Sequence, residues 1–472
     1  MIRHLCLFAV LVSSPLCLPQ GVAQEAEPQP KLTLISNVNI FDGVNDKLHP
    51  NMHVLVKDNL IETVSDEPLA IIQTDNVTMI DGGGRTLMPG LIDSHVHLTY
   101  SGTPDAIPAR EAMQWDQLGG TQALNAREFL MDGFTTVRDA GACYDGIKKL
   151  VDRDLLVGPR IYPSGGILSQ TSGHADWRTV SQRNPNLTAA RDNNLGRLGL
   201  MHLVDGVDRV LAATRQNLAA GATQIKMTTG GGVSSTLDPL HTVQYLPEEI
   251  EAAVRAAKDW DTYVMVHAYT DETVKRSLNA GVLCIEHGQM MSDEAMKLLV
   301  EKEAFLSPNM AAISEELLQH PVYGQGAIGK KTRGFIDGSQ NFVKLVNEYK
   351  PKVVYNTDVV ATDLVSSRGV RDNNLWVHAK SFGNFDALRA MTSVGGELMR
   401  LTGKHNPYPG KLGVIEPGAY ADIILVEGNP LKDITVLGAR PKMFEGEPRT
   451  DEGFTTMPFI MKNGKIYKNE LE

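Results

Sequence analysis

Short apolar runs recur along the middle of the chain, and several of them are separated by stretches with helical periodicity. The runs are "LMPGLIDSHVHL", "FTTVRDAG", "PRIYPSGG", "TQIKMTTGG", "TYVMVHAYT", "VLCIEHG", "AFLSPNM" and "KVVYNTD". Runs of this kind are typical of strands that are buried on both faces. The stretches "LPEEIEAAVRAAKDW", "TDETVKRSLNAG" and "MSDEAMKLLVEKEA" each have an apolar helical face and acidic residues in the first turn. Eight strands alternating with helices predict an α/β fold, the (β/α)8 TIM barrel.

The two ends of the chain have a different pattern. The stretches "KLTLISNVNIFDG", "HVLVKDNLIETV" and "VTMIDGGGRTLMPG" near the N-terminus are short β-prone runs bounded by Asp, Asn and Gly. The same pattern returns in "ADIILVEGNPL" and "FIMKNGKIYKN", where Asn463 and Gly464 form a typical hairpin turn. Neither end has enough apolar surface to fold alone, so we expect one composite β-sandwich domain. Residues 31–88 and 404–472 are assigned to it, and residues 89–403 to the barrel.

The first 23 residues are similar to a secretory signal peptide, with a basic start, an apolar stretch and small residues up to Ala23. The apolar stretch is too short, and too interrupted by Pro15, to cross a bilayer as a mature helix. We therefore expect an exported protein, periplasmic or secreted, without a membrane anchor. Residues 24–30 are assigned to a spacer.

The charge of the chain restricts its partners. A formal net charge of -11 opposes binding to nucleic acid or to an anionic membrane surface. An anionic substrate would need local positive charge, and metal ions are one source of it.

The sharpest polar signals lie where the predicted strands end. His95 and His97 in "DSHVHL" are two residues apart, so both imidazoles of an extended strand face one side and can reach one metal ion. His267, His287 and Asp358 each close a further apolar run. Any one of them alone fits a hydrogen-bonded core or rim residue, but burying five such groups together is costly unless something satisfies them. The sequence therefore predicts a metal site at the carboxyl end of the barrel.

Lys226 in "QIKMTTGGG" lies at the same level of the predicted barrel. A protonated lysine cannot ligate a metal, but a buried amine close to cations tends to lose its proton and becomes reactive. The alternative role is a hook for a phosphate or carboxylate beside the glycine-rich loop.

Together these motifs strongly resemble the amidohydrolase superfamily, over both the barrel and the flanking β-domain. The resemblance implies two divalent ions and a carbon dioxide-derived carbamate on Lys226 that bridges them together with a hydroxide. It assigns one ion to His95, His97 and Asp358, and the other to His267 and His287. It also implies that Asp358 passes a proton from the attacking hydroxide to the departing amine. The imidazole-rich set favours Zn2+, although manganese or cobalt also fits.

The substrate is indicated by "GPRIYPSGGILSQTSGHADW", "MTTGGGVSS" and "QYLPEEI". These stretches resemble the branch that contains ochratoxinase and the bacterial prolidase-like carboxypeptidases. The resemblance implies hydrolysis of an amide or peptide bond next to a free C-terminal carboxylate in dipeptides or N-acyl amino acids. Cleavage of ochratoxin A to ochratoxin alpha and phenylalanine falls within this class.

Several side chains are candidate substrate contacts. In this branch His174 would reach the scissile carbonyl or the substrate carboxylate, and Tyr245 could donate its hydroxyl to that carboxylate. Alternatively, His174 is a capping residue and Tyr245 is a residue at the edge of the core. Arg138 and Arg368 are candidate anion partners, although Arg138 precedes Asp139 and also fits a structural pair.

Two positions depart from the pattern of the relatives. Tyr269 stands where the ochratoxinase pattern has a second histidine after the fifth-strand ligand, and we count it among the substrate contacts. Asn356 stands where relatives often have glycine, which predicts a narrower site.

Other functions remain open at this stage. A cyclic-amide hydrolase or deaminase of the imidazolonepropionase-like group is one, but deaminases commonly need one metal and no lysine. A non-catalytic exported binding protein is another, but such a protein should have lost a ligand, and all six are present. The resemblance also implies a homo-oligomer.

Overall fold

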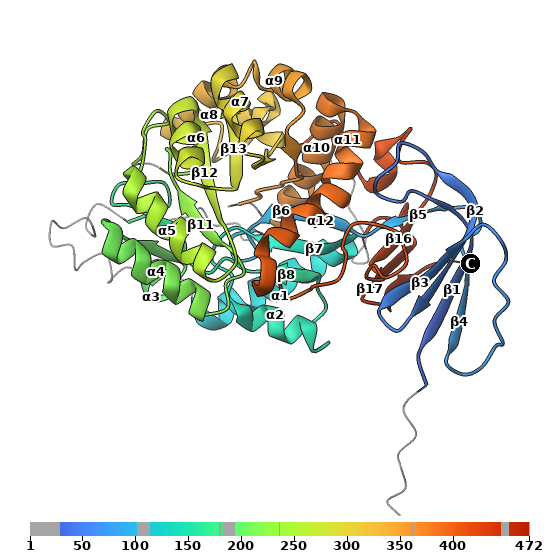
Figure 1. Ribbon diagram of the computed structural model, residues 1–472. Helices are drawn as coiled ribbons and strands as arrows, with labels where there is room; N and C mark the ends of the chain where they lie inside the picture. The colour runs from blue at the N-terminus through green and yellow to red at the C-terminus, as the bar shows by residue number, and fades with distance from the viewer. Residues whose placement is uncertain are drawn as a thin grey trace, which may run out of the picture.

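The computed structural model describes residues 29–101, 114–178, 182, 194–235, 237–360, 363–444 and 453–471. The predicted signal peptide lies outside the described residues, as does most of the spacer. The chain forms a barrel of parallel strands with helices on its outside, and a second sheet lies beside it (Figure 1). The predicted α/β fold class, a TIM barrel with a separate sheet domain built from both ends of the chain, is therefore confirmed. The strands that were expected to form a β-sandwich pair into one continuous sheet.

Eight parallel strands form the barrel, and each coincides with one of the eight apolar runs of the sequence, although β13 extends two residues beyond its run. In chain order they are β6 (Leu91–Val96), β7 (Phe134–Asp139), β8 (Arg160–Tyr162), β11 (Ile225–Thr228), β12 (Val264–Thr270), β13 (Cys284–Met290), β14 (Phe305–Ser307) and β15 (Lys352–Val353). Strand pairing joins β6 to β8 in one arc and β11 to β15 in another.

Backbone hydrogen bonds close these two arcs into a barrel. The N–H of Asp358 donates to the carbonyl oxygen of His95 at 3.0 Å, which joins the end of the last strand to the first. Between β8 and β11, the N–H of Thr223 donates to the carbonyl oxygen of Pro163 at 2.8 Å. Asp358 and His95, two predicted ligands 263 positions apart, are thus neighbours through their backbones.

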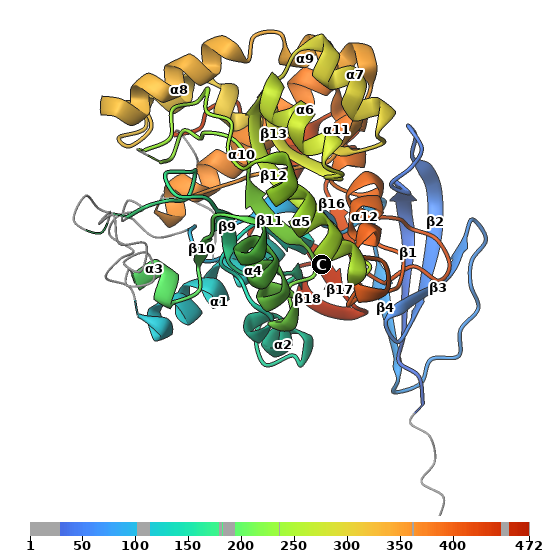
Figure 2. The same cartoon turned by 60° about the vertical axis from the view of Figure 1, so that its left-hand side comes forward.

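Helices cover the outside of the barrel strands (Figure 2). They are α1 (Trp115–Met131), α2 (Asp145–Asp152), α4 (Val207–Ala219), α5 (Pro247–Asp259), α6 (Asp271–Asn279), α7 (Asp293–Glu301), α9 (Phe342–Tyr349), α10 (Leu364–Phe382), α11 (Asn384–Ala390) and α12 (Ser393–Met399). The three predicted helices are α5, α6 and α7. Their starts follow the sequence signals, since α5 begins with a proline and the side chain of Ser292 caps α7.

The structure adds elements that the strand pattern does not predict. Short strands β9 (Ile167–Ser169) and β10 (Met201–Leu203) extend the sheet beyond β11. Between β14 and β15 the chain forms two 3-10 turns and helix α8 (Gly326–Gly338). This insertion supplies one wall of the pocket described below. The remaining short helix is α3 (Asn194–Arg197).

The β-domain is one continuous sheet of eight strands. Its members are β1 (Leu32–Ile40), β2 (His49–Lys57), β3 (Leu60–Ser65), β4 (Val77–Asp81), β5 (Thr86–Pro89), β16 (Ile423–Val426), β17 (Phe459–Lys462) and β18 (Lys465–Asn469). Antiparallel pairing of β5 with β16 joins the two ends of the chain, and Figure 1 shows the blue and red strands side by side. The predicted turn at Asn463 and Gly464 links β17 and β18. The exact domain boundaries stay predictions.

Alternate residues of β16 and β17 belong to two different apolar clusters, one on each face of the sheet. Ile424 and Ile460 pack with residues of the barrel, whereas Ile423, Leu425 and Phe459 pack with the N-terminal strands. This period of two is expected for strands that are buried on both faces. The β-domain is thereby fixed to the barrel through its own central strands.

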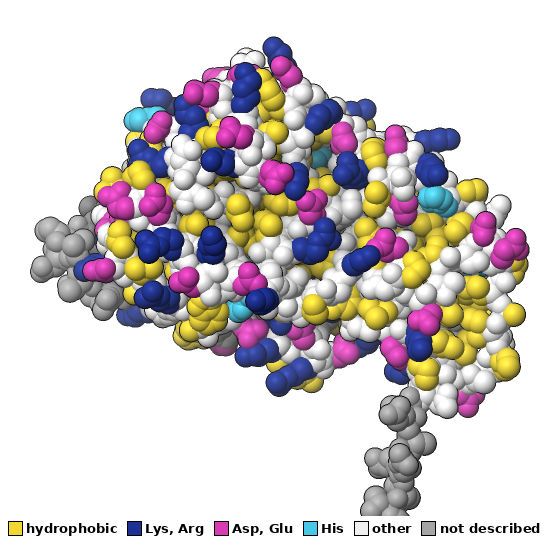
Figure 3. Space-filling view, viewed as in Figure 1, with side chains coloured by type: hydrophobic (Ala, Val, Ile, Leu, Met, Phe, Trp, Pro, Cys, Tyr) yellow, Lys and Arg dark blue, Asp and Glu magenta, His cyan; other side chains and the backbone are white. Residues whose placement is uncertain are grey.

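The surface and the helices bear on possible partners. On the face in Figure 3, basic and acidic side chains are interspersed, and its described residues form no continuous basic surface. Among the helices that the structure describes, none has the length and apolarity needed to cross a membrane.

Candidate metal centre

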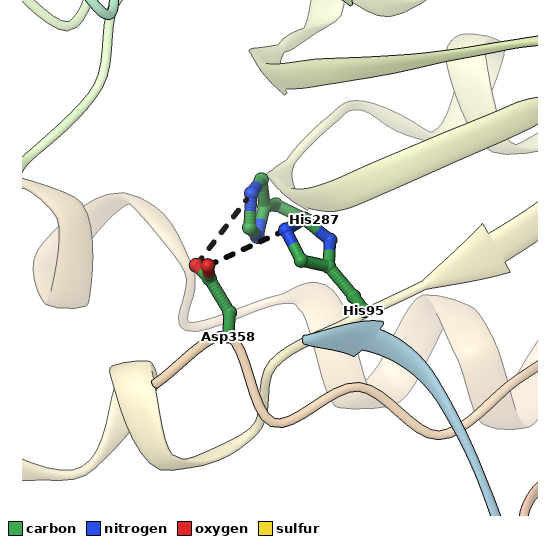
Figure 4. A group of neighbouring side chains, drawn as sticks. All are labelled: His95, His287 and Asp358. Carbon is green, nitrogen blue, oxygen red and sulfur yellow. Dashed lines mark ion pairs between the residues drawn. The ribbon is translucent and has the colours of Figure 1, made fainter. Parts of the chain in front are cut away.

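The residues predicted as metal ligands converge on one pocket at the carboxyl end of the barrel strands. All six line it: His95, His97, Lys226, His267, His287 and Asp358. The pocket has an empty volume of about 1020 Å3, part of which is open to solvent. Figure 4 shows the rings of His95 and His287 directed toward the carboxylate of Asp358.

Strand periodicity directs Lys226 and His267 into the barrel. In β11, Ile225 and Met227 pack in the apolar cluster between the strands and the outer helices, so Lys226 between them faces inward. In β12, Val266 belongs to the same cluster and the next residue, His267, faces the pocket. The chain thus buries polar groups inside a barrel whose outer strand faces are apolar.

His287 and Asp358 leave regular strand geometry. Their φ angles are 76° and 43°, in the left-handed region that non-glycine residues seldom adopt. Glu286 already faces the barrel interior, and the left-handed backbone at the next residue lets His287 face the same side. Backbone strain of this kind clusters at functional sites.

Distances within the cluster are short. Nε2 of His97 lies 3.1 Å from Oδ1 of Asp358, and Nε2 of His95 lies 3.3 Å from the same oxygen. Nε2 of His287 lies 3.8 Å from Oδ2 of Asp358. Nζ of Lys226 lies 3.5 Å from Nε2 of His95. These groups therefore face a common centre.

Hydrogen bonds on the far side of two rings fix which nitrogen faces that centre. Nδ1 of His95 donates to Oε2 of Glu286 at 2.7 Å, which leaves Nε2 without hydrogen. Nε2 of His267 lies 3.3 Å from the carbonyl oxygen of Gly231, so it donates there and leaves Nδ1 as the free acceptor. Both rings present a lone pair to the centre.

Burial lowers the pKa of the basic groups in the cluster. It lowers the pKa of His97 to about 4 and the pKa of His267 and His287 well below the usual value. Burial also lowers the pKa of Lys226, which favours its neutral amine. For Asp358, burial acts to raise the pKa, but His95, His97 and His287 together outweigh it and hold the pKa well below the usual range. The cluster therefore combines lone pairs with one negative charge.

This donor set fits a divalent metal ion. Ligand atoms of His95, His287 and Asp358 all lie within 4.8 Å of one another. The imidazole lone pairs and the carboxylate are all electron donors, so they do not attract one another when they are buried together. A cation bound between them would interact favourably with all of them. The arrangement could hold a metal through these residues.

A buried ion pair supports the centre from behind. Arg138 is fully buried, and its Nη2 lies 2.6 Å from Oε1 of Glu286, whose other oxygen accepts from His95. Burial acts to raise the pKa of Glu286, but the nearby charges, that of Arg138 first among them, and the hydrogen bond with His95 together lower the pKa well below the usual value and keep the carboxylate ionised. The prediction that Arg138 contacts the substrate anion is therefore wrong, because its side chain lies behind His95 and does not line the pocket.

Two further predicted substrate contacts also lie away from the pocket. Both Nε and Nη2 of Arg368 bind the carboxylate of Glu128, at 2.8 and 2.6 Å. The side chain of Tyr245 is buried in the apolar cluster outside β11, and no hydrogen-bond partner for its hydroxyl is found among the described residues. We correct both assignments, because these side chains are used within the fold.

Asn356 does not narrow the site in the way expected. Its side chain is fully buried behind His95, where Nδ2 donates to the carbonyl oxygen of Ser307 at 2.7 Å. It lies between two strands and not in the wall of the pocket.

His174 and Tyr269 do line the pocket. The ring of His174 stacks on the ring of His267 with centroids 4.0 Å apart. The ring of Tyr269 lies 4.5 Å from that of His267 and 4.6 Å from that of Phe335 on α8. Further walls are apolar and aromatic, supplied by Tyr100, Trp177, Leu317, Tyr323, Val359 and Val370.

Comparison with known proteins decides the family. The family model described as amidohydrolase family matches residues 86–452, which is most of the chain. The chain belongs to the amidohydrolase family. It is accordingly a hydrolase of amide carbon–nitrogen bonds, and the resemblance seen in the sequence is confirmed.

Individual amidohydrolases are similar over nearly the whole chain. Ochratoxinase of Aspergillus niger is 24% identical over 503 residues, covering 99% of this chain and 97% of its own. A crystal structure of a prolidase complexed with N-methylphosphonate-L-proline has a TM-score of 0.81 and 30% identity, covering 93% of this chain and 100% of its own. A Xaa-Pro dipeptidase with bound methionine in the active site has a TM-score of 0.76 and 25% identity, with 93% and 100% covered.

Three residues at this site were not singled out in the sequence. Glu286 directly precedes the ligand His287, so its place next to a predicted ligand was an available signal. Asp238 and Lys331 contact the surroundings of His174, but neither lies in a recognisable motif.

Proposed function

We propose that this protein is a binuclear metal-dependent hydrolase that cleaves the amide or peptide bond next to a free C-terminal carboxylate. The observation that carries the proposal is the convergence of four imidazoles, Lys226 and Asp358 on one pocket of an amidohydrolase barrel. The similarity to a prolidase, a Xaa-Pro dipeptidase and an ochratoxinase supports the substrate class. Dipeptides and N-acyl amino acids are the proposed substrates, with ochratoxin A as one candidate.

The proposed cofactors are two divalent ions, most simply Zn2+, and a carbamate on Lys226. One ion would be held by His95, His97 and Asp358, and the other by His267 and His287, with the modified lysine between them. The burial of Lys226 supports this assignment, because it lowers the pKa of the amine and only an unprotonated amine reacts with carbon dioxide. When bound, the ions would supply positive charge that activates a water molecule and polarises the scissile carbonyl.

The protein's own residues would carry the proton. The side chain of Asp358 is 21% exposed, whereas that of His95 is 1% exposed, so part of the carboxylate is open to the pocket. It can accept the proton of the attacking water and deliver it to the departing nitrogen, which is general base and then general acid catalysis. His174 is proposed to contact the carbonyl oxygen as it becomes negative, or the substrate carboxylate.

The pocket fits a substrate of dipeptide size. Its volume suits a small ligand, and its aromatic and aliphatic walls would exclude water from the substrate side chains. Tyr269 is proposed as a substrate contact at the wall beside His267.

The competing functions are less well supported. A cyclic-amide hydrolase or deaminase is not favoured, because the similar solved structures include a prolidase and a Xaa-Pro dipeptidase, and Lys226 lies within the ligand cluster. A non-catalytic binding protein would have no use for an intact set of ligands. Export to a periplasm or medium, and a homo-oligomeric state, are proposed on the sequence alone.

A hydrolysis screen tests the substrate class. Dipeptides and N-acyl amino acids varied at the C-terminal residue, together with ochratoxin A, should be cleaved, while their C-terminal amides should not. Cleavage of lactones or cyclic ureas alone would overturn the proposal.

Metal analysis tests the centre separately. The purified enzyme should hold about two equivalents of divalent metal, as two-metal sites do. Lys226→Ala should lose metal and activity together. Full activity of that variant would reject the carbamate.

A further inference from the structure

A buried chain of polar side chains leads from His174 to helix α8. Nδ1 of His174 lies 2.7 Å from Oγ of Ser235 and 3.2 Å from Oδ2 of Asp238. Asp238 is fully buried, and its Oδ1 lies 3.4 Å from Nζ of Lys331 on α8. None of these three partners belongs to the proposed ligand set.

The hydrogen-bond directions define the state of the His174 ring. The hydroxyl of Ser235 donates to Oδ1 of Asp238, so its oxygen can only accept from His174. The carboxylate of Asp238 is also an acceptor. Burial acts to raise the pKa of Asp238, but its contacts with His174, Lys331 and Ser235 together lower the pKa below the usual value, which favours the ionised carboxylate. Nδ1 of His174 must therefore carry hydrogen, and Nε2 is the nitrogen left for the pocket.

The backbone of His174 is held as firmly as its ring. Its N–H donates to Oε1 of Gln244 at 2.9 Å, and its carbonyl oxygen accepts from the hydroxyl of Thr228 at 2.9 Å. On the other face of the ring lies His267. With the main chain and one ring nitrogen fixed, the position of Nε2 is determined by the contact with Ser235 and Asp238.

Lys331 connects the loop that contains Ser235 and Asp238 to helix α8, which forms part of the pocket wall. Its Nζ donates to the carbonyl oxygens of Gly232 and Ser235, each at 2.6 Å, and faces Asp238. Thr332 and Phe335 on the same helix line the pocket. The loop that orients His174 is thus tied to the helix that bounds the substrate.

We propose that Asp238 is a positioning residue for catalysis, which holds the His174 ring so that Nε2 meets the substrate oxygen, and that Lys331 holds Asp238 in place. This inference rests on the proposed hydrolase function and adds two residues to its machinery. A contact that strengthens as the carbonyl oxygen becomes negative acts on kcat and not on KM.

A double-mutant cycle tests the proposal on the metal-loaded enzyme. Asp238→Asn should lower kcat about 10- to 100-fold, the range typical of orienting partners, with little change in KM. In a His174→Asn background the same change should have less than about a twofold effect, because Asp238 acts through His174. An equal loss in both backgrounds, or no loss in the wild-type background, would overturn the proposal.

Controls separate positioning from general damage. Metal content should be unchanged in Asp238→Asn, and Asp337→Asn, at an exposed position of α8, should keep the wild-type kcat. If Asp238→Asn does not fold, Ser235→Ala removes the nearer partner and should give the same pattern in the cycle. Lys331→Met should lower kcat less than Asp238→Asn does.

A spectroscopic measurement is independent of catalysis. The N–H of a histidine ring bound to a buried carboxylate should give a low-field proton resonance in the wild type and in Asp337→Asn. It should vanish in His174→Asn and in Asp238→Asn, and its persistence in Asp238→Asn would reject the contact. A wild-type enzyme that cleaves no peptide but shows this pattern would contradict the proposed function and leave the contact itself confirmed.

Discussion

Nδ1 of His95 lies 2.7 Å from the carboxylate of Glu286, on the opposite edge of the ring from the atom that faces Asp358. The second oxygen of Glu286 binds Arg138 at 2.6 Å. All three side chains are almost completely buried. The proposed metal ligand is therefore oriented by a charge pair that has no contact with the pocket.

Removing the charge of Glu286 should damage both stability and metal binding. In Glu286→Gln the guanidinium of Arg138 stays buried without a counter-charge, which should cost about 3–5 kcal/mol in the free energy of unfolding. The apparent metal affinity should fall about 10- to 100-fold, because His95 loses its orienting partner. Urea unfolding of the metal-free protein would measure the loss of stability. Competition with a chelator would measure the loss of metal affinity. Glu416→Gln, which breaks an exposed pair with Lys411, should cost less than about 1 kcal/mol. Equal effects of the two substitutions would contradict the role of the buried pair.

A methyl group at Gly232 should displace His174. A Cβ built on Gly232 lies 2.1 Å from both Cε1 and Nδ1 of that ring, and the backbone there needs no left-handed φ. The effect of Gly232→Ala should therefore come from the collision alone. A ring shift near 1 Å would lower kcat/KM about 100-fold while the bound metal is retained. Steady-state kinetics with metal analysis would check this, and Gly146→Ala, whose Cβ meets nothing within 4 Å, is the matched control.

The barrel and its ligands could be predicted because their signals are local. Each strand is a short apolar run, and each ligand stands at the end of such a run, so position in the sequence implies position at one end of the barrel. The pairing of Asp358 with His95 then follows from closure of the barrel.

The partners of charged side chains could not be predicted in this way. Arg138 binds Glu286 across 148 positions, and Arg368 binds Glu128 across 240. Both arginines looked available for an anionic substrate because their partners lie in distant elements. Asp238 was overlooked for the same reason, since it lies 64 positions from His174. The local sequence pattern is enough to locate a strand or a helix. The partner of a charged side chain depends on how distant elements pack in the folded protein.

Tyr269 offers a test of substrate contact without loss of packing. The side chain of Tyr269 lines the pocket, where its hydroxyl can meet a substrate. Tyr269→Phe keeps the ring against His267 and Phe335. Loss of one hydrogen bond of about 0.5–1.5 kcal/mol should raise KM about 2- to 10-fold, with metal content unchanged. An unchanged KM for every cleaved substrate would exclude a contact through the hydroxyl.

His378 should make the fold sensitive to acid at a site remote from the metal centre. Its ring is fully buried between Tyr355 and Phe382, and no partner for either nitrogen is found among the described residues. Burial lowers its pKa from 6.5 to about 3. Between these values the unfolded chain binds a proton that the folded chain does not, so stability falls as the pH falls from 6.5 toward 3.

The substitution His378→Leu should remove this dependence. From about pH 6 to about pH 5, the wild type should lose up to about 1.4 kcal/mol more unfolding free energy than the variant. Near neutral pH the variant should be at least as stable, because it buries no donor without an acceptor. Urea unfolding across this range would measure the difference in unfolding free energy, and His241→Gln, at an exposed position, is the control. The prediction is contradicted if the unfolding free energy of wild type and of His378→Leu depends on pH in the same way. The ring of His378 would then be protonated in the folded protein as easily as in the unfolded chain.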